Sequence, residues 1–183
     1  MGFHILEAVQ AWHTPWLDWL MIFFSRLGNG GMLWVVVTVL LLLHKPTREA
    51  GMICGLSLLF SLLLCNLILK PLVLRPRPFT QQTLDLLIPP PTGASFPSGH
   101  ASSSFAGATG LSVIGPKVAI PAYIVAAIIS FSRIYLQVHF PGDVLAGAVL
   151  GIGCGVLARW LVMHIQARNT ARKTHCGGDH YDR

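Results

Sequence analysis

The chain has 183 residues, of which 53% are apolar and only 11% are charged, and its mean hydropathy is +0.62. Soluble domains carry roughly 25% charged residues, so 13 Lys and Arg with 7 Asp and Glu would cover a small soluble protein poorly. The apolar content excludes disorder, and four cysteines are too few for a disulfide scaffold. We therefore expect an integral membrane protein with one compact domain.

The net charge of +6 does not indicate a nucleic-acid partner, because the basic residues are scattered between apolar runs and form no patch. Residues 169–183 are predicted to be a disordered polar tail. A metal site in that tail is the alternative, built from His175, Cys176 and His180. The other cysteines lie inside apolar runs, where small buried side chains are expected: Cys54, Cys65 and Cys154.

The first apolar stretch, residues 16–24, is rich in tryptophan but short. Within residues 1–27 it either completes a tilted membrane span or lies in the interface as an aromatic anchor, and the sequence leaves both open. Residues 27–44 follow, with a glycine-rich start and a continuous apolar run. The N-terminus lacks the basic region of a cleavable signal peptide, so we expect none.

The clearest span is residues 50–69, where 20 consecutive residues carry no charge. This length matches the roughly 20 residues that cross a bilayer as a helix. Beyond a long polar loop lie residues 101–116, 118–132 and 144–163, and flanking Lys and Arg can extend such shorter runs to the interface. We predict an all-α bundle of six transmembrane helices, the first the least well defined, in a single domain over residues 1–168.

Small residues recur within the later spans. Gly147, Gly151 and Gly155 form two overlapping GxxxG patterns, which allow neighbouring helices to approach closely. We therefore expect a tightly packed bundle.

Alternating crossings place the loops at residues 70–100 and 133–143 on one side of the membrane. The other side, with residues 45–49, Lys117 and the C-terminal tail, holds the larger share of the 13 Lys and Arg. By the positive-inside rule we expect both termini in the cytoplasm and the two long loops outside.

Three segments of those loops carry the polar residues that stand out in an apolar chain. They are residues 70–78, with Lys70 and Arg77; residues 96–100, which read Phe-Pro-Ser-Gly-His; and residues 132–143, with Ser132, Arg133, His139 and Asp143. Alternation of the crossings brings all three to the same membrane face.

The cations in these segments predict an anion site. Lys70, Arg77 and Arg133 come to the edge of a low-dielectric region, which is costly unless an anion neutralises them. Residues 97–99 open a helix, so backbone amides at its N-terminus point towards the same anion, and Gly99 lets the backbone approach closely. Arginine and lysine together suit a phosphate.

Two histidines add chemistry to this site. His139 and Asp143 are four residues apart, so the carboxylate can accept the Nδ1 proton and leave Nε2 as a nucleophile. His100, on another loop, can protonate the departing oxygen. Asp143 and Asp85 are the only acidic residues in these loops, so we expect neither a metal ion nor another cofactor.

The three segments read KxxxxxxRP, PSGH and SRxxxxxHxxxD over residues 70–143. This pattern resembles the signature of the type 2 phosphatidic acid phosphatase superfamily and matches it at every signature position. The resemblance implies a six-helix membrane bundle that removes phosphate without a metal, through a phosphohistidine intermediate. It also implies roles for individual residues: His139 as nucleophile, Asp143 as its partner, His100 as acid, Lys70, Arg77, Ser98, Gly99 and Arg133 as phosphate ligands, and Pro97 and Ser132 as supporting residues.

Taken alone, Lys70 and Arg77 are typical of cations at a membrane boundary, and only the complete signature favours a catalytic role. Arg75 falls outside the signature, and we interpret it as a contact to a lipid headgroup or to the loop.

On this basis we expect a multi-pass lipid phosphate phosphatase in a bacterial inner membrane, with its site on the outer face and undecaprenyl diphosphate as the leading substrate. Phosphatidylglycerol phosphate and phosphatidic acid stay open as substrates, as does phosphoryl transfer to a second lipid. A phosphate-binding membrane protein without activity is the non-enzymatic alternative, although such a protein is expected to have lost one of His100, His139 or Asp143. The sequence does not indicate an oligomeric state.

Overall fold

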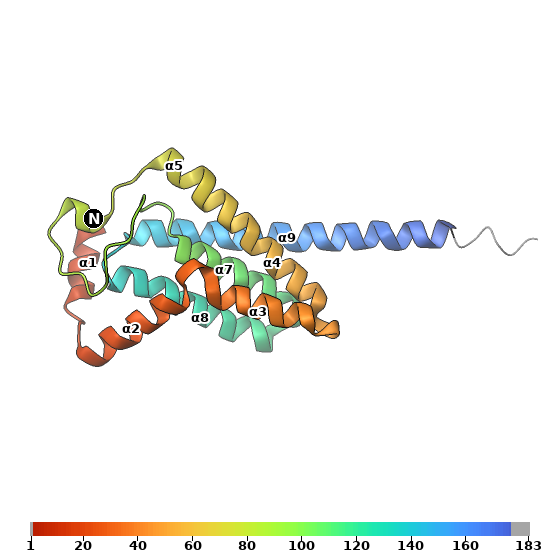
Figure 1. Cartoon of the computed structure of the whole chain (residues 1–183), viewed down its shortest axis with the longest axis horizontal. Helices are drawn as coiled ribbons and strands as arrows, with labels where there is room; N and C mark the ends of the chain where they lie inside the picture. Colours follow the sequence, from red (N-terminus) through yellow and green to blue (C-terminus); the bar gives the residue numbers. More distant parts are fainter. Residues whose placement is uncertain (1, 177–183) are drawn as a thin grey trace, which may run out of the picture.

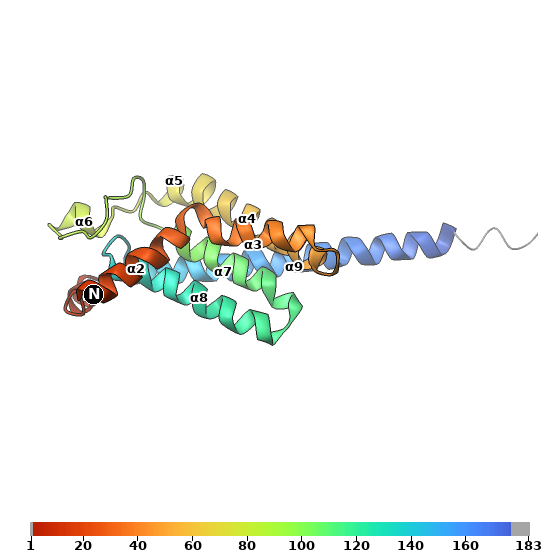
Figure 2. The same cartoon turned by 60° about the horizontal axis from the view of Figure 1, so that its bottom comes forward.

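The computed structural model describes residues 2–176, with side chains described as far as residue 169. Within this range the chain is helical and has no strand, which confirms the predicted all-α class. A membrane-spanning chain must satisfy its backbone polar groups internally, and helices achieve this. Figures 1 and 2 show a helix bundle with long loops at one end, called the loop end below, and α9 (Pro141–Cys176) extending beyond the other.

The N-terminal part of the chain contains a bent pair of helices. After α1 (Gly2–Gln10), α2 (Pro15–Leu27) and α3 (Met32–Leu43) are separated by a short break that includes the 3-10 turn η1 (Asn29–Gly31). α2 and α3 bend by 48° and are long and apolar enough to cross a membrane only together. Gly30 and Gly31 in the break adopt positive φ, which glycine does at little steric cost.

The next crossing is long and almost continuous. α3 connects through the turn η2 (Lys45–Thr47) to α4 (Arg48–Leu62), which runs on as a π-helical segment, η3 (Leu63–Leu69), and ends in α5 (Lys70–Val73). These residues coincide with the clearest span of the sequence. The following loop contains only a short helix, α6 (Pro78–Gln81), before α7 begins.

α7 (Gly99–Leu111) lies at the centre of the bundle, among α4, α8 (Pro116–Tyr135) and α9 (Figures 1 and 2). Most of its 13 residues are buried, and most are Gly, Ala, Ser or Thr. Small side chains let the neighbouring helices pack closely around it, where lipid provides no hydrophobic driving force.

The glycines of α9 make the contact with α7. A Cβ added at Gly147 would lie 2.5 Å from the Ser98 carbonyl oxygen, and one at Gly151 would collide with the Ser102 carbonyl. A Cβ at Gly155 would collide with the Thr109 side chain. The close helix approach predicted from the GxxxG patterns is therefore present, between α7 and α9.

The predicted number of six spans is not confirmed. Within residues 2–176, three helices have the length and composition to cross a membrane, and the bent pair α2–α3 makes a fourth. α2 and α3 reach the length of a span only jointly, because the glycine-rich stretch that looked like a helix entry is a break between them. α7 was expected as a span but has only 13 residues.

The position of α1 differs from the expectation that the N-terminal end lies opposite the long loops. The Phe3 and Phe140 rings meet edge-on with centroids 5.1 Å apart, and Gln137 Nε2 donates to the Leu6 carbonyl at 3.5 Å. α1 therefore packs against the loop end.

Helix α9 continues to Cys176, beyond residue 168, which is the predicted end of the domain. The rest of the predicted tail, residues 177–183, lies outside the described residues. The same holds for the side chains of the alternative metal site in the tail.

Close contact between α7 and α9 predicts that Gly151→Ala lowers the free energy of unfolding by about 2 kcal/mol, because the added methyl group meets backbone atoms. Gly153→Ala is the matched control, since a Cβ there has nothing within 4 Å. SDS titration of the purified protein in mixed micelles measures both. Equal stability of the two variants would contradict this packing.

Candidate active site

Loops distant in sequence meet at the loop end of the bundle. Arg77 Nη1 donates to the Val138 carbonyl at 3.0 Å, and the backbone N–H of Ser98 donates to the Asp143 carbonyl at 2.9 Å. These bonds join the segment after α5, the start of α7 and the α8–α9 connection. The three segments singled out in the sequence therefore lie together, as the alternation of crossings predicts.

His139 and Asp143 are both buried, but they do not pair as simply as their spacing suggests. His139 Nδ1 lies 3.7 Å from Asp143 Oδ2, which is beyond hydrogen-bond distance. The Ser95 hydroxyl lies between them, 2.5 Å from Asp143 Oδ2 and 3.4 Å from His139 Nδ1. Since it donates its proton to the carboxylate, it accepts from the ring.

The other ring nitrogen fixes the tautomer of His139. Its Nε2 lies 3.2 Å from Arg77 Nη1, and a guanidinium only donates. Nε2 therefore carries the lone pair, while Nδ1–H points to Ser95 and Asp143. A lone pair at Nε2 is what a nucleophilic histidine requires.

Burial lowers the pKa of His139 to about 4, and the Arg77 and Arg133 cations act in the same direction, although Asp143 opposes them. The ring is consequently neutral at physiological pH. It becomes protonated, and loses the lone pair at Nε2, only as the pH falls through about 4.

Asp143 has further partners that the sequence did not reveal. Arg75 Nη1 donates to Oδ1 at 2.7 Å, and the Phe140 backbone N–H donates to Oδ2 at 3.0 Å. The Arg75 guanidinium also lies 4.5 Å from the centre of the Phe140 ring. Of the two interpretations of Arg75, a contact to a lipid headgroup or to the loop, these contacts favour the second, since its guanidinium bonds to a fully buried carboxylate in residues 133–143.

Arg77 is also hydrogen-bonded to the long loop that precedes α7. Its Nε donates to the Gly93 carbonyl at 2.9 Å and its Nη2 to the Thr92 carbonyl at 3.2 Å. Only 6% of Arg77 is exposed. These contacts give the long loop between α6 and α7 a structural role, because they fix the guanidinium beside His139 before any ligand binds.

The other two cations face the same space. Lys70 Nζ donates to Asn66 Oδ1 at 2.8 Å, and a Cβ at Gly99 would lie 3.5 Å from that ammonium. Arg133 is 3% exposed and donates through Nη1 to the Ser25 hydroxyl. Its Nε is buried with no hydrogen-bond partner among the described residues. A buried donor of this kind suits a bound anion.

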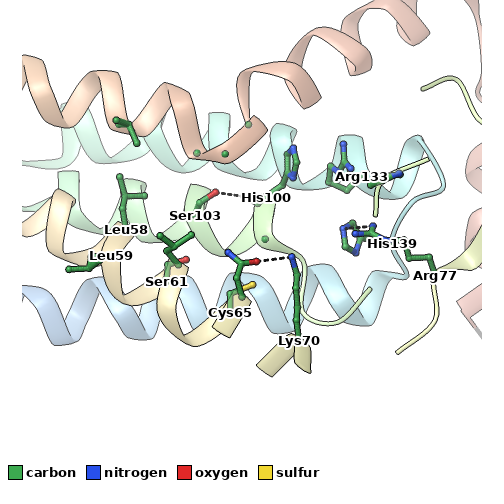
Figure 3. Close-up of a pocket in the computed structure, with 18 residues that line it drawn as sticks. Leu58, Leu59, Ser61, Cys65, Lys70, Arg77, His100, Ser103, Arg133 and His139 are labelled. Atoms are coloured by element: carbon green, nitrogen blue, oxygen red, sulfur yellow. Dashed lines mark hydrogen bonds between the residues drawn. The ribbon is translucent and has the colours of Figure 1, made fainter. Parts of the chain in front are cut away.

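These groups surround a cavity of about 360 Å³ (Figure 3). Its polar end is formed by Lys70, Arg77, Gly99, His100, Arg133 and His139. Figure 3 shows these histidines and arginines at one end of the cavity and Leu58 and Leu59 at the other. The cavity thus joins a cationic end that suits phosphate to an apolar wall.

Three of the expected phosphate or supporting residues do not line the cavity. The Ser98 hydroxyl accepts from the Ala101 backbone N–H at 3.5 Å and so caps α7, while Ser132 donates within its own helix. The Pro97 carbonyl lies 3.8 Å from Cys65 Sγ. These residues shape the backbone around the site.

Four residues at the site escaped the sequence analysis. Asn66 precedes Lys70 by four residues on a helix, and this spacing was a usable signal. Ser25, Asn29 and Ser95 reach the site only through the fold, from segments that carry no recognisable pattern.

The family model described as the PAP2 superfamily matches residues 50–168. An undecaprenyl-diphosphatase of Sulfolobus acidocaldarius is 40% identical over 137 residues, which are 74% of this chain and 66%, slightly under two thirds, of that protein. The lipid A 4'-phosphatase of Bacteroides thetaiotaomicron is 34% identical over 175 residues, which are 87% of this chain and 74% of that protein.

Two solved structures share the fold. Aquifex aeolicus LpxE superposes with a TM-score of 0.76 at 29% identity, over 86% of this chain and 93% of its own. A phosphatidylglycerolphosphate phosphatase from Bacillus subtilis gives a TM-score of 0.68, also at 29% identity, over 90% of this chain and 84% of its own. Fold and site therefore define a protein of the membrane phosphatase class. The chain belongs to the PAP2 superfamily.

The position of Ser95 predicts that Ser95→Ala lowers kcat about tenfold, since a hydrogen bond to a charged group contributes roughly 1.5–3 kcal/mol. Phosphate release from phosphatidic acid in detergent micelles measures this. Ser130→Ala is the control, because its buried hydroxyl bonds only to the Ala126 carbonyl of its own helix. A Ser95→Ala enzyme as fast as this control would rule out Ser95 as the link between His139 and Asp143.

Proposed function

We propose that this protein is a lipid phosphate phosphatase that works through a phosphohistidine intermediate on His139. One observation carries the proposal: a buried, neutral imidazole presents its Nε2 lone pair to a cavity that also holds Lys70, Arg77 and Arg133. A nucleophile among cations is the arrangement that phosphoryl transfer needs.

In the first step His139 Nε2 attacks the phosphorus atom. A bond forms between phosphorus and Nε2, the bond to the leaving oxygen breaks, and His100 gives that oxygen a proton. The ring of His139 gains positive charge, which Asp143 balances through Ser95. The surrounding cations stabilise the charge on the phosphoryl oxygens.

In the second step a water molecule attacks the phosphorus atom. Its proton passes to His100, the bond between phosphorus and Nε2 breaks, and inorganic phosphate forms. The proton of the first step enters with the bound phosphate group as its monoanion, which passes it to the neutral His100 ring, and the second step returns a proton to that ring. The histidines thus act as nucleophile and acid, and the cations balance the charge.

The apolar wall of the cavity supports a lipid as the substrate. Val35 of α3 and Leu58, Leu59 and Leu62 of α4 line it, and Leu62 is 56% exposed on the outside of the bundle. A phosphate seated at the cationic end therefore leaves its hydrocarbon chain against these residues, between α3 and α4.

Undecaprenyl diphosphate is the substrate that we propose first. Its support comes from relatives, because the Sulfolobus acidocaldarius protein carries that name, as does the Bacillus subtilis protein BcrC, which is 28% identical over 86% of this chain and 82% of its own length. Phosphatidylglycerol phosphate stands second, supported by the similar Bacillus subtilis structure.

We further propose that the cavity faces the outer side of a bacterial inner membrane. The α3–α4 and α7–α8 connections lie at the end opposite the site in Figures 1 and 2. Lys45 lies in the first connection, and Arg48 and Lys117 lie in the first turns of α4 and α8 beside them. The positive-inside rule assigns this end, with the C-terminal half of α9, to the cytoplasm.

Phosphate release from a panel of lipid phosphates, with chelator present throughout, tests the activity. We expect release by the wild type and none by His139→Ala. With a ³²P-labelled diphosphate and an alkaline quench, His100→Ala is expected to retain label on the protein, because the second step lacks its base. Label on His139→Ala, or strict dependence on added metal, would contradict the mechanism.

Cysteine labelling in intact spheroplasts tests the orientation. In a Cys176→Ser background, Gln82→Cys at the loop end is expected to react with an impermeant maleimide, and Pro46→Cys only after permeabilisation. The native Cys54, Cys65 and Cys154 are buried, so the background is low. The reverse pattern would place the site on the cytoplasmic side.

A further inference from the structure

The break between α2 and α3 lies directly against the site, although it belongs to neither the family signature nor the matched region. Gly28 is packed so closely that a Cβ there would lie 2.7 Å from His100 Cδ2 and 2.6 Å from Ile129 Cγ2. Only a residue without a side chain lets the chain pass this close to the histidine. The backbone of the break therefore packs directly against the His100 ring.

Two oxygen atoms, one from the last turn of α2 and one from the break, approach the same nitrogen of His100. Its Nε2 lies 3.2 Å from the Ser25 carbonyl oxygen and 3.0 Å from Asn29 Oδ1. A carbonyl oxygen only accepts, so Nε2 must carry the proton. Asn29 then presents its amide oxygen to the same N–H.

This proton assignment leaves one nitrogen for the reaction. In the neutral ring Nδ1 holds the lone pair, and it makes no hydrogen bond to any residue that the structure describes. When the ring takes up a second proton, that proton sits on Nδ1, while Ser25 and Asn29 stabilise the positive charge from the other side. Nδ1 is thus the nitrogen that is free to exchange protons with a ligand in the cavity.

Ser25 ties the same segment to the phosphate site a second time. Its hydroxyl accepts a hydrogen bond from Arg133 Nη1, while its carbonyl accepts from His100. Ser25 is 3% exposed. One turn of chain thereby sets the positions of a phosphate-binding cation and of the acid relative to each other.

We propose that Asn29 is a positioning residue, which with the Ser25 carbonyl holds the proton of His100 on Nε2 and leaves Nδ1 to protonate the leaving oxygen. This inference rests on the proposed function and deepens it by naming the nitrogen that transfers the proton. In the first step the Nδ1 proton goes to the leaving oxygen as its bond to phosphorus breaks. In the second, Nδ1 takes the proton of the attacking water.

The need for this proton depends on the leaving group. A lipid monophosphate releases an alcohol, which leaves poorly as an alkoxide and needs the proton. A lipid diphosphate releases a lipid monophosphate, whose ionised form is weakly basic and leaves without one. Disturbing His100 therefore affects monophosphates more than diphosphates, whereas general damage to the site affects both alike.

The tautomer is tested by NMR of the ¹⁵N-histidine-labelled protein in micelles, with His100 assigned from the missing signal in His100→Gln. We expect the Nε2–H form in the wild type and a larger share of the Nδ1–H form in Asn29→Ala. The Nδ1–H form in the wild type, or identical spectra of wild type and Asn29→Ala, would overturn the inference. This readout needs no activity, so it stands even if the proposed function fails.

Kinetics test the role. Asn29→Ala is expected to lower kcat for phosphatidic acid by about tenfold, a part of the roughly 10²–10⁴-fold that general acid catalysis supplies, with little change for a lipid diphosphate. Asn29→Asp keeps an oxygen in place and is expected to restore the rate. Met32→Ala, an exposed residue just beyond the break, is the control and is expected to match the wild type.

The double variant Asn29→Ala with His100→Ala separates positioning from loss of structure. If Asn29 acts through His100, the double variant is no slower than His100→Ala alone. Equal losses on both substrates, or an additive loss in the double variant, would overturn the positioning role. Absence of phosphate release by the wild type from every lipid would instead refute the proposed function.

Discussion

A buried carboxylate at the start of α9 is the interaction on which the site depends. Asp143 is fully buried, and such a charge is tolerated only when partners surround it. Those partners come from separate segments: Arg75 from the loop after α5, Ser95 from the approach to α7, and the Phe140 backbone from the α8–α9 connection. Satisfying one charge therefore brings the polar segments together, and His139 is carried into place with them.

The helices supply the frame in which this convergence is possible. α7 begins at the site and α9 begins beside it. The glycines of α9 pack directly against α7, so the two helices cannot shift along each other without a steric clash. The positions of His100 on α7 and Asp143 on α9 are thereby coupled through backbone contact. A polar site at a membrane surface is thus built on the part of the bundle that packs most closely.

Much of the fold and site could be predicted from the sequence, and the exceptions have physical reasons. Apolar runs and charge spacing identify the helical bundle, and the signature brings His100, His139 and the cations to one place. The bend between α2 and α3 could not be foreseen, because a glycine-rich break looks the same as a helix start in the sequence. Ser95 and Asn29 could not be foreseen, since a single polar residue acquires its partner only from tertiary structure, and the partner of Arg75 could not be foreseen for the same reason.

The π-helical segment η3 aligns the apolar and the cationic parts of the cavity along one helix. In an α-helix four residues turn slightly more than a full circle, so residues spaced by four drift steadily around the axis. The wider winding of a π-helix turns less per residue and reverses that drift. Leu58, Leu62, Asn66 and Lys70 all line the cavity across this segment. The change in winding keeps the hydrocarbon wall and the ammonium group in one line along the helix.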